Sequence, residues 1–358
     1  MARRALQLLA VAALAAGCTE ADAPTGISAN NRPPVVRPPA GPNATIAPTR
    51  TVNAIQISAW GYHTCALESD NVVACWGDGR LPNGAGVFQR RYTWISVGLV
   101  ADCGIRVSDG AIDCWRGSDE FTAAVPSGTF TRVAVGGAHA CAIRTDKTIA
   151  CWGENSDGQT NSPTGTYDDI TSGGYHSCAV GTDDTQVCWG KPQYSDVDPS
   201  PGEPVTSWGG AWFQISAGFE FACGLRTTGA LVCGGDNSFG QIGDVGQYGQ
   251  TYINIAAGFR HTCGVTTAFT LRCWGVNGHG QATPPAGNAF SQVTAGERHS
   301  CAITNGNVWC WGDNTLHQLD VPYEIGERKN TETHPRGPRN LDVRNRRESV
   351  LGDSRPGT

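Results

Sequence analysis

The chain has little charge, almost no methionine and no long hydrophobic run. Only 16% of its 358 residues are charged, methionine occurs once, and the formal net charge is −6. A negative net charge argues against nucleic-acid binding, because such proteins need a basic stripe that displaces counterions from phosphate. The apolar run from Ala5 to Ala16 has twelve residues, which is too short to cross a bilayer core of roughly 30 Å as a helix.

The sequence also lacks the motifs of common active sites. It has no nucleophile elbow, no His-Glu-x-x-His metal motif and no phosphate-binding loop. We therefore expect no catalytic residue, no metal site and no cofactor, and we expect a protein that is not an enzyme. What the sequence does contain is glycine, 47 residues of it, a composition typical of many short strands joined by tight turns.

The first 18 residues are predicted to be a lipoprotein signal peptide. Two arginines precede the apolar run, which ends in Leu14-Ala15-Ala16-Gly17-Cys18. This ending resembles the lipobox of bacterial lipoproteins, in which the cysteine is acylated and becomes the mature N-terminus. The resemblance implies an exported protein at the bacterial outer membrane or cell surface, whose only membrane contact is a lipid on Cys18. The alternative is ordinary signal-peptide cleavage with Cys18 incidental.

Two further segments are predicted to lie outside the folded part. Residues 19–50 contain seven prolines and almost no apolar periodicity, which predicts a flexible, extended tether. Residues 323–358 are polar, with eight Lys or Arg and six Asp or Glu, which predicts a disordered tail. The alternative for this tail is a weak docking patch formed by its arginines.

The other fourteen cysteines reveal an internal repeat. They fall into seven pairs separated by nine to eleven residues, and the first cysteines recur every 37 to 45 residues. A period in that range is typical of a propeller or a solenoid. The pairs are Cys65 and Cys75, Cys103 and Cys114, Cys141 and Cys151, Cys178 and Cys188, Cys223 and Cys233, Cys263 and Cys273, and Cys301 and Cys310.

Other positions repeat in phase with the cysteines. Ile or Val lies eight residues before every first cysteine, and another aliphatic residue lies two after it. Glycine lies five residues before it in six units, with Trp60 as the departure. Tryptophan follows the second cysteine in six units, with Gly234 as the departure.

The last unit shows what each cysteine pair does. Asn305-Gly306 is the preferred two-residue hairpin turn, and it places Cys301 opposite Cys310. Their Cα atoms then lie about 4.5 Å apart at a non-hydrogen-bonded pair, a separation that a disulfide accepts. An exported chain meets an oxidising compartment, where disulfides persist. We therefore predict one disulfide within each hairpin. Zinc is the alternative, but its sites usually bring cysteines in Cys-x-x-Cys pairs, and none occurs.

Each unit of about 38 residues has room for four short antiparallel strands, the size of a propeller blade. The unit resembles the repeat of the regulator of chromosome condensation family. One copy runs from Gly136 and His139 through Trp152-Gly153 to Asn155, Gly158 and Gln159, and parts of it recur at residues 235–243 and 274–281. The resemblance implies an all-β fold, a seven-bladed β-propeller of four-stranded antiparallel blades, which we place at residues 51–322.

Five histidines stand two residues before a first cysteine. One interpretation is a ring of metal ligands or bases, and the other is a structural imidazole that hydrogen-bonds backbone within its own blade. We favour the structural role, because equivalent positions in different blades lie far apart. The histidines are His63, His139, His176, His261 and His299.

Irregular stretches between units are the candidate binding sites. The longest step, 45 residues, separates the fourth and fifth units, and residues 79–94 form a second irregular stretch. Such departures mark loops on a binding face, and Trp and Tyr often anchor interfaces. The candidate partner-binding residues are Phe88, Tyr92, Tyr194, Trp208 and Trp212. The alternative is that these aromatic side chains simply cover blade ends.

Taken together, these features predict a monomeric, lipid-anchored propeller that acts as a protein-binding scaffold. Two alternatives stay open. The family resemblance implies guanine-nucleotide exchange on a small GTPase, which export opposes because that GTPase is cytoplasmic. Inhibition of a secreted hydrolase is the third possibility, and aromatic loops on one face suit it.

Overall fold

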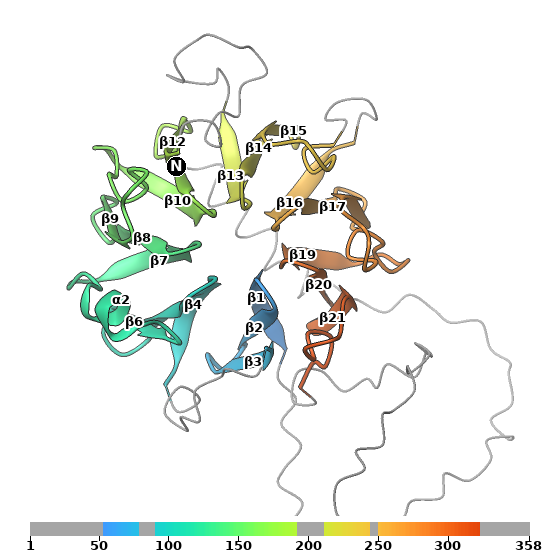
Figure 1. Cartoon of the computed structure of the whole chain (residues 1–358), viewed down its shortest axis with the longest axis horizontal. Coiled ribbons are helices and arrows are strands. Elements are labelled where there is room, and N and C mark those ends of the chain that lie inside the picture. The colour runs from blue at the N-terminus through green and yellow to red at the C-terminus, as the bar shows by residue number, and fades with distance from the viewer. Residues whose placement is uncertain (1–52, 79–89, 192–210, 244–249, 323–358) are drawn as a thin grey trace, which may run out of the picture. The chain divides into compact units, whose positions relative to one another are not determined.

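The computed structural model describes residues 53–78, 90–191, 211–243 and 250–322. These residues form seven antiparallel sheets arranged as blades around a central axis (Figure 1). In every sheet, strands that are consecutive in sequence pair with each other, and the first strand lies nearest the axis. The predicted all-β, seven-bladed β-propeller is thus confirmed.

The first three blades lie between residues 54 and 153. Blade 1 contains β1 (Ala54–Trp60), β2 (His63–Glu68) and β3 (Val73–Gly77). Blade 2 contains β4 (Tyr92–Val97), β5 (Asp102–Arg106) and β6 (Ile112–Trp115), followed by the short helix α2 (Asp119–Ala123). Blade 3 contains β7 (Phe130–Val135), β8 (His139–Arg144) and β9 (Ile149–Gly153).

The remaining four blades follow in chain order. Blade 4 contains β10 (Tyr167–Ser172), β11 (His176–Gly181) and β12 (Gln186–Gly190). Blade 5 contains β13 (Trp212–Ala217), β14 (Phe221–Arg226) and β15 (Leu231–Gly235). Blade 6 contains β16 (Tyr252–Ala257), β17 (His261–Thr266) and β18 (Leu271–Gly275), and blade 7 contains β19 (Phe290–Ala295), β20 (His299–Thr304) and β21 (Asn307–Gly312).

Among the described residues, each blade has three strands, where the sequence predicts four. In blade 3, residues 154–166 form turns and irregular backbone in place of a fourth strand. The reason is side-chain chemistry, because Asn155 Oδ1 accepts the Thr160 N–H at 3.0 Å and Gln159 Oε1 accepts the Asp157 N–H at 2.9 Å. These bonds satisfy backbone donors locally and so compete with a strand ladder.

Every blade carries one disulfide between its second and third strands. The paired cysteines are direct cross-strand neighbours in all seven sheets, with Cα atoms 4.0 to 4.1 Å apart. In blade 7, Thr304 faces Asn307 and Ile303 faces Val308, which is the predicted register of a two-residue turn. The prediction of seven disulfides, each within one hairpin, is confirmed.

The hydrophobic core lies between neighbouring blades. In one cluster, Ile105 and Ile112 of blade 2 pack against Val133 and Ala142 of blade 3. The ring closes in the same way, because Ile57 of blade 1 shares a cluster with the blade 7 residues Ile303 and Val308. The described strands of blade 1 come from one continuous segment, and the Ala54 N–H also bonds to the carbonyl oxygen of Gly306 in blade 7 at 2.9 Å (Figure 1).

Glycine is required where the blades meet near the axis. A Cβ atom on Gly173 would lie 2.3 Å from the carbonyl oxygen of Gly218, the equivalent glycine of the next blade. The same carbonyl accepts the backbone N–H of Gly174 at 3.2 Å. This contact explains the glycine five residues before the first cysteine of blade 4, since a side chain there would push two blades apart.

Candidate functional site

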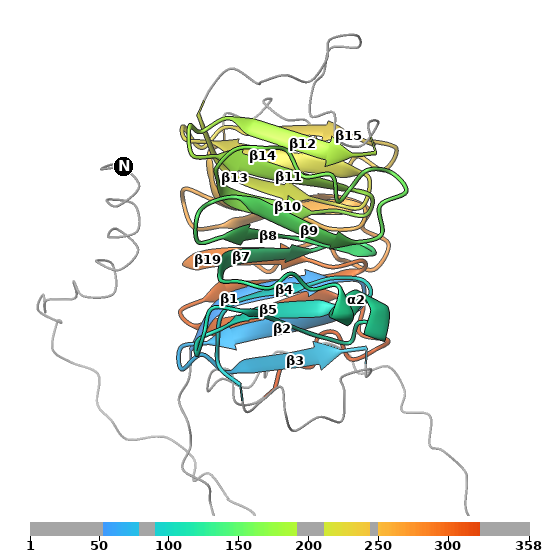
Figure 2. The same ribbon diagram turned by 90° about the vertical axis from the view of Figure 1, so that its left-hand side faces the viewer.

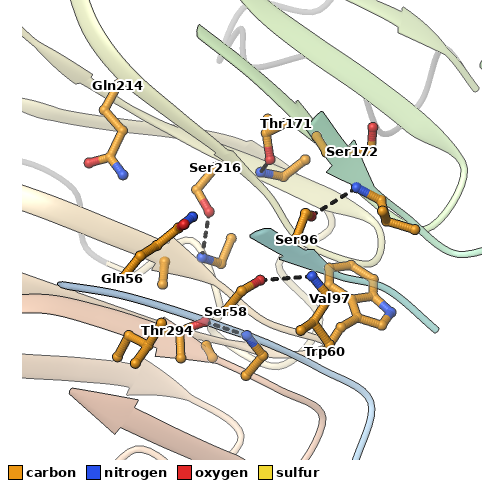
Figure 3. A pocket seen from close by; sticks show the side chains of 18 of the residues that line it. Gln56, Ser58, Trp60, Ser96, Val97, Thr171, Ser172, Gln214, Ser216 and Thr294 are labelled. Carbon is orange, nitrogen blue, oxygen red and sulfur yellow. Dashed lines mark hydrogen bonds between the residues drawn. The ribbon is translucent and has the colours of Figure 1, made fainter. Parts of the chain in front are cut away.

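A cavity of about 180 Å³ lies on the axis and is lined by the first strand of every blade (Figure 3). Five hydroxyl side chains on these strands each accept a backbone N–H from the next blade, at 2.8 to 3.0 Å. They are Ser58, Ser96, Thr171, Ser216 and Thr294 (Figure 3). The hydroxyls therefore fasten neighbouring blades together around the axis.

Amide side chains in the cavity have the same role. Gln56 donates to the carbonyl oxygen of Ile95 at 2.9 Å and accepts the Ile95 N–H at 3.0 Å. Gln214 makes the equivalent pair of bonds to Ile255, at 3.2 and 3.1 Å. Because these polar groups already bind the backbone of the next blade, we assign the cavity lining to the framework of the ring.

Trp60 at the cavity belongs to a core cluster that a phenylalanine of another blade also contacts. Trp60, which stands in the glycine column, is 5% exposed and lines the cavity (Figure 3). Phe219 of blade 5 packs against the core cluster that contains Trp60 of blade 1. Since blades 1 and 5 are not neighbours in the ring, this contact crosses the axis. The departure from glycine at Trp60 thus has a packing role on the axis.

The loops that join the first and second strands form one face of the propeller, which we call the loop face. These loops carry Leu99, Val100, Tyr175, Phe219 and Phe259, which we call the axial patch. The rings of Phe219 and Phe259 stack at 4.1 Å, and Tyr175 meets Phe219 edge-on at 5.2 Å. Leu99 is 42% and Val100 is 39% exposed. The axial patch is therefore an apolar surface contributed by blades 2, 4, 5 and 6.

Charged groups surround this apolar centre. The positions concerned are those four and three residues before each first cysteine and the one three residues after each second cysteine. In six blades, the backbone N–H of the last position bonds to the loop between the first and second strands. These positions hold three cations, Lys191, Arg260 and Arg298, all of which lie over aromatic rings. They hold six carboxylates, namely Asp78, Glu154, Glu220, Asp236, Glu297 and Asp313.

The five repeated histidines are buried at the boundaries between blades. Four of them place Nε2 at 2.7 to 2.8 Å from a side-chain oxygen of the next blade, which corrects the expected backbone bond within the same blade. The partners of His63, His139, His261 and His299 are Asp102, Ser177, Ser300 and Thr64. This arrangement supports the structural role, because each imidazole links two blades.

Burial keeps most of these imidazoles neutral. Desolvation lowers the pKa of His139 and His261 to about 4 and the pKa of His176 and His299 to about 3. Within the described residues, neither ring nitrogen of His176 has a hydrogen-bond partner. The four histidines above bond to a serine, threonine or aspartate that directly precedes the first cysteine of the next blade. In blade 5, which follows His176, this residue is Ala222.

Blade 2 holds a buried charged group that the sequence reasoning missed. Asp102 is fully buried, bonds to His63 at 2.8 Å, and lies 3.2 Å from Nη1 of Arg116. Arg116 has a φ of 65°, at a position where the other six blades have glycine. The signal was present in the sequence, because Asp102 and Arg116 are both departures from the repeat within one unit. The arginine compensates a carboxylate that would otherwise be buried without an opposite charge.

Two of the predicted partner-binding residues are in the core, which corrects that prediction. Tyr92 and Trp212 are fully buried and begin the first strands of blades 2 and 5. The reason is packing against glycine: a Cβ on Gly104 would lie 2.5 Å from Tyr92, and one on Gly224 would lie 2.6 Å from Trp212. An aromatic residue stands eleven before the first cysteine in six units, so the pattern was visible in the sequence.

The other candidates lie outside the described residues. These are Phe88, Tyr194 and Trp208, together with Cys18, the tether and the tail. Within the described ranges, no three or more His, Cys, Asp or Glu side chains are grouped to hold a metal ion. In the same part of the chain, no helix is long and apolar enough to cross a membrane.

Comparison with known proteins identifies the repeat. The family model of the regulator of chromosome condensation (RCC1) repeat matches residues 130–159, 214–241, 252–281 and 290–318. These are regulator of chromosome condensation repeats. They correspond to blades 3, 5, 6 and 7, whose third strand is followed by the turn that ends in a buried glutamine. No relative among the curated proteins matches the chain.

Several solved structures share the fold of this chain. The ectodomain of the Physcomitrella patens receptor kinase CR4 is 25% identical, with a TM-score of 0.58 over 73% of this chain and 74% of that chain. The ectodomain of Arabidopsis thaliana ACR4 is 21% identical, with a TM-score of 0.58 over 73% and 98%. Prp20p from Saccharomyces cerevisiae is 16% identical, with a TM-score of 0.56 over 70% and 82%.

Proposed function

We propose that this repeat propeller is a protein-binding scaffold that engages its partner through the axial patch. The observation that carries the proposal is the exposure of Leu99 and Val100 in the same set of loops that holds the stacked rings of Phe219 and Phe259. Protein interfaces combine an apolar, aromatic centre with a polar rim, and the loop face has both. Prp20p, which shares the fold, has binding properties to Gsp1p and histones.

The proposed location follows from the cysteines and the N-terminal sequence. Seven disulfides indicate an extracellular or exported protein, since thiols are kept reduced in the cytosol. We propose that a lipid on Cys18 and the tether of residues 19–50 hold a monomeric propeller at the membrane surface, with no catalytic activity of its own. Guanine-nucleotide exchange stays the alternative that the family implies, and the disulfides oppose it because a small GTPase and its nucleotide are cytoplasmic.

Affinity capture with matched surface variants tests the proposal. Leu99→Ser with Val100→Ser changes two exposed residues of the loop face, and Val107→Ser with Phe269→Ser changes two residues of similar exposure in the hairpin turns at the opposite face. We expect the first variant to lose partners that the unchanged chain captures, with an affinity lowered by about 2 kcal/mol or more. The second variant should retain them.

Two outcomes of the capture experiment would contradict the proposed binding surface. If the loop-face variant captured the same partners with the same affinity as the unchanged chain, the axial patch would not be the binding surface. If the hairpin-face variant alone lost them, the binding surface would be the other face of the ring.

A further inference from the structure

We propose that the junction between blades 4 and 5 is the point at which the ring opens first, and that opening there divides the axial patch. The inference goes beyond the binding function proposed above, because it concerns how the ring itself is held closed. At this junction β13 packs against β10 and β11, and blades 4 and 5 lie side by side in both views (Figure 1 and Figure 2).

A buried histidine at this junction has no hydrogen-bond partner. His176 of blade 4 is fully buried, and neither of its ring nitrogens is bonded within the described residues. At four other junctions, the histidine bonds to a side-chain oxygen of the next blade, where blade 5 has only the methyl group of Ala222. The remaining two junctions have Ala101 and Phe221 in place of the histidine, so they bury no imidazole. A buried polar group without a partner destabilises the contact that buries it.

The same junction lacks a tryptophan. In the other six blades, the tryptophan after the second cysteine belongs to or packs against the core cluster shared with the preceding blade. Blade 5 has Gly234 there, so the cluster between blades 4 and 5 gains no side chain from this position. The junction of blades 2 and 3 also has no histidine, but it keeps Trp152 in its cluster, and Trp94 donates to the carbonyl oxygen of Val133 at 3.0 Å. Within the described residues, an unpaired histidine and a missing tryptophan therefore coincide at one junction.

Two hydrogen bonds across the junction can report its opening. The Ala217 N–H donates to Oγ1 of Thr171 at 3.0 Å, and the Gly174 N–H donates to the carbonyl oxygen of Gly218 at 3.2 Å. Each bond joins one blade to the other, so both amides become free to exchange with water when the blades separate. Local opening of a folded protein occurs most often where few contacts oppose it.

Opening at this junction changes the axial patch. Tyr175 of blade 4 meets Phe219 of blade 5 edge-on at 5.2 Å. Phe219 also stacks on Phe259 of blade 6 and packs against the cluster of Trp60, so it is held from other blades. Separation of blade 4 from blade 5 therefore takes Tyr175 away from Phe219. A partner that contacts both rings binds the closed ring better and shifts the population toward it.

Native-state hydrogen exchange of the full chain, followed by NMR, tests where the ring opens. The Ala217 amide is compared with the Ala257 amide, which donates to Ser216 Oγ at 2.9 Å across the junction of blades 5 and 6. That junction keeps Trp274, which donates to the backbone oxygen of Gln241. After correction for intrinsic rates, we expect Ala217 to exchange about tenfold faster, the effect of one to two missing hydrogen bonds.

Ala222→Ser supplies the missing partner. Serine at this position lies 2.8 Å from the histidine Nε2 at two other junctions. We expect Ala222→Ser to slow the exchange of Ala217 about fivefold and to leave that of Ala257 unchanged. Ala140→Ser is the matched control, because it also precedes a first cysteine while the preceding blade has Ala101 in place of histidine. This control should not slow the exchange of Ala217.

The inference is overturned if Ala217 exchanges no faster than Ala257 in the unchanged chain, a comparison that needs no substitution. It is also overturned if Ala140→Ser slows Ala217 as much as Ala222→Ser does, because the effect would not then come from His176. Either result leaves the proposed binding surface standing, since the variants of Leu99 and Val100 test that surface separately.

Discussion

At the scale of single residues, the buried histidines make the ring sensitive to acid. In the unfolded chain a histidine takes up a proton below its ordinary pKa of about 6.5. In the folded protein, burial lowers the pKa of His176 to about 3, so this residue stays neutral. The unfolded state therefore binds more protons as the pH falls, and stability is lost between about pH 6.5 and the folded pKa, by about 1.4 kcal/mol per pH unit for each such histidine.

Replacing His176 by phenylalanine should make the protein less sensitive to acid. Blade 5 has Phe221 at the same position, and no described group bonds the His176 ring, so the change removes one titrating group without breaking a hydrogen bond. We expect the melting temperature of His176→Phe to fall less between pH 7 and pH 4.5 than that of the unchanged protein. The exposed His279→Gln is the control, and its slope should equal that of the unchanged protein. Equal slopes for His176→Phe would contradict the account.

At the scale of elements, the turn after the third strand of one blade is coupled to the tryptophan of the next. Trp274 of blade 6 donates its Nε1 proton to the backbone oxygen of Gln241 in blade 5, at 2.8 Å. Three more pairs repeat this contact: Trp76 with Gln318, Trp189 with Gln159, and Trp311 with Gln281. Blade 4 lacks the glutamine, and blade 5 has Gly234 in place of the tryptophan. Units 1 and 2 also lack the glutamine, yet Trp115 and Trp152 stand in the units that follow them, so a missing glutamine does not by itself remove the tryptophan.

This coupling predicts unequal effects of the same substitution. Trp274→Phe removes an interblade hydrogen bond, whereas the Nε1 of Trp152 has no partner among the described residues. We expect Trp274→Phe to lower the free energy of unfolding by about 1 kcal/mol more than Trp152→Phe does. Chemical denaturation of the two variants measures the difference. A larger loss for Trp152→Phe would show that the bond to Gln241 contributes nothing.

The elements also show which parts of the fold the sequence predicts well. Register could be predicted because the Asn305-Gly306 turn and the cysteine spacing allow a single pairing of the two strands. The fourth strand was predicted from the length of the unit, but in blade 3 the polar turn chemistry of Asn155 and Gln159 occupies the residues that it would need. Tyr92 and Trp212 lie in the core and not in a binding loop. They belong to the set of aromatic residues that stand eleven before the first cysteine in six units.

At the scale of the whole molecule, the candidate site was not predictable from local patterns. Phe219 and Phe259 come from neighbouring blades and stack only because the blades are arranged in a ring. Leu99, Phe219 and Phe259 all stand four residues before the first cysteine, but the other units have glycine or glutamate there, so the position shows no repeated residue type. The contact of Phe219 with the cluster of Trp60 crosses the axis, which no argument from one unit can anticipate.

Ring closure in turn requires that the strands of every blade pair in the correct register. The loop face, the histidine contacts and the axial patch all require seven blades whose second and third strands are joined at the same register. The disulfides indicate this register directly, because each one links two cysteines that face each other on the second and third strands.

Mass mapping of peptides from the unreduced, exported protein is the most direct test of this architecture. The account predicts seven disulfide-linked peptides, each joining two cysteines nine to eleven residues apart. A bond between cysteines of different blades, or free thiols at these positions in the exported protein, would contradict it.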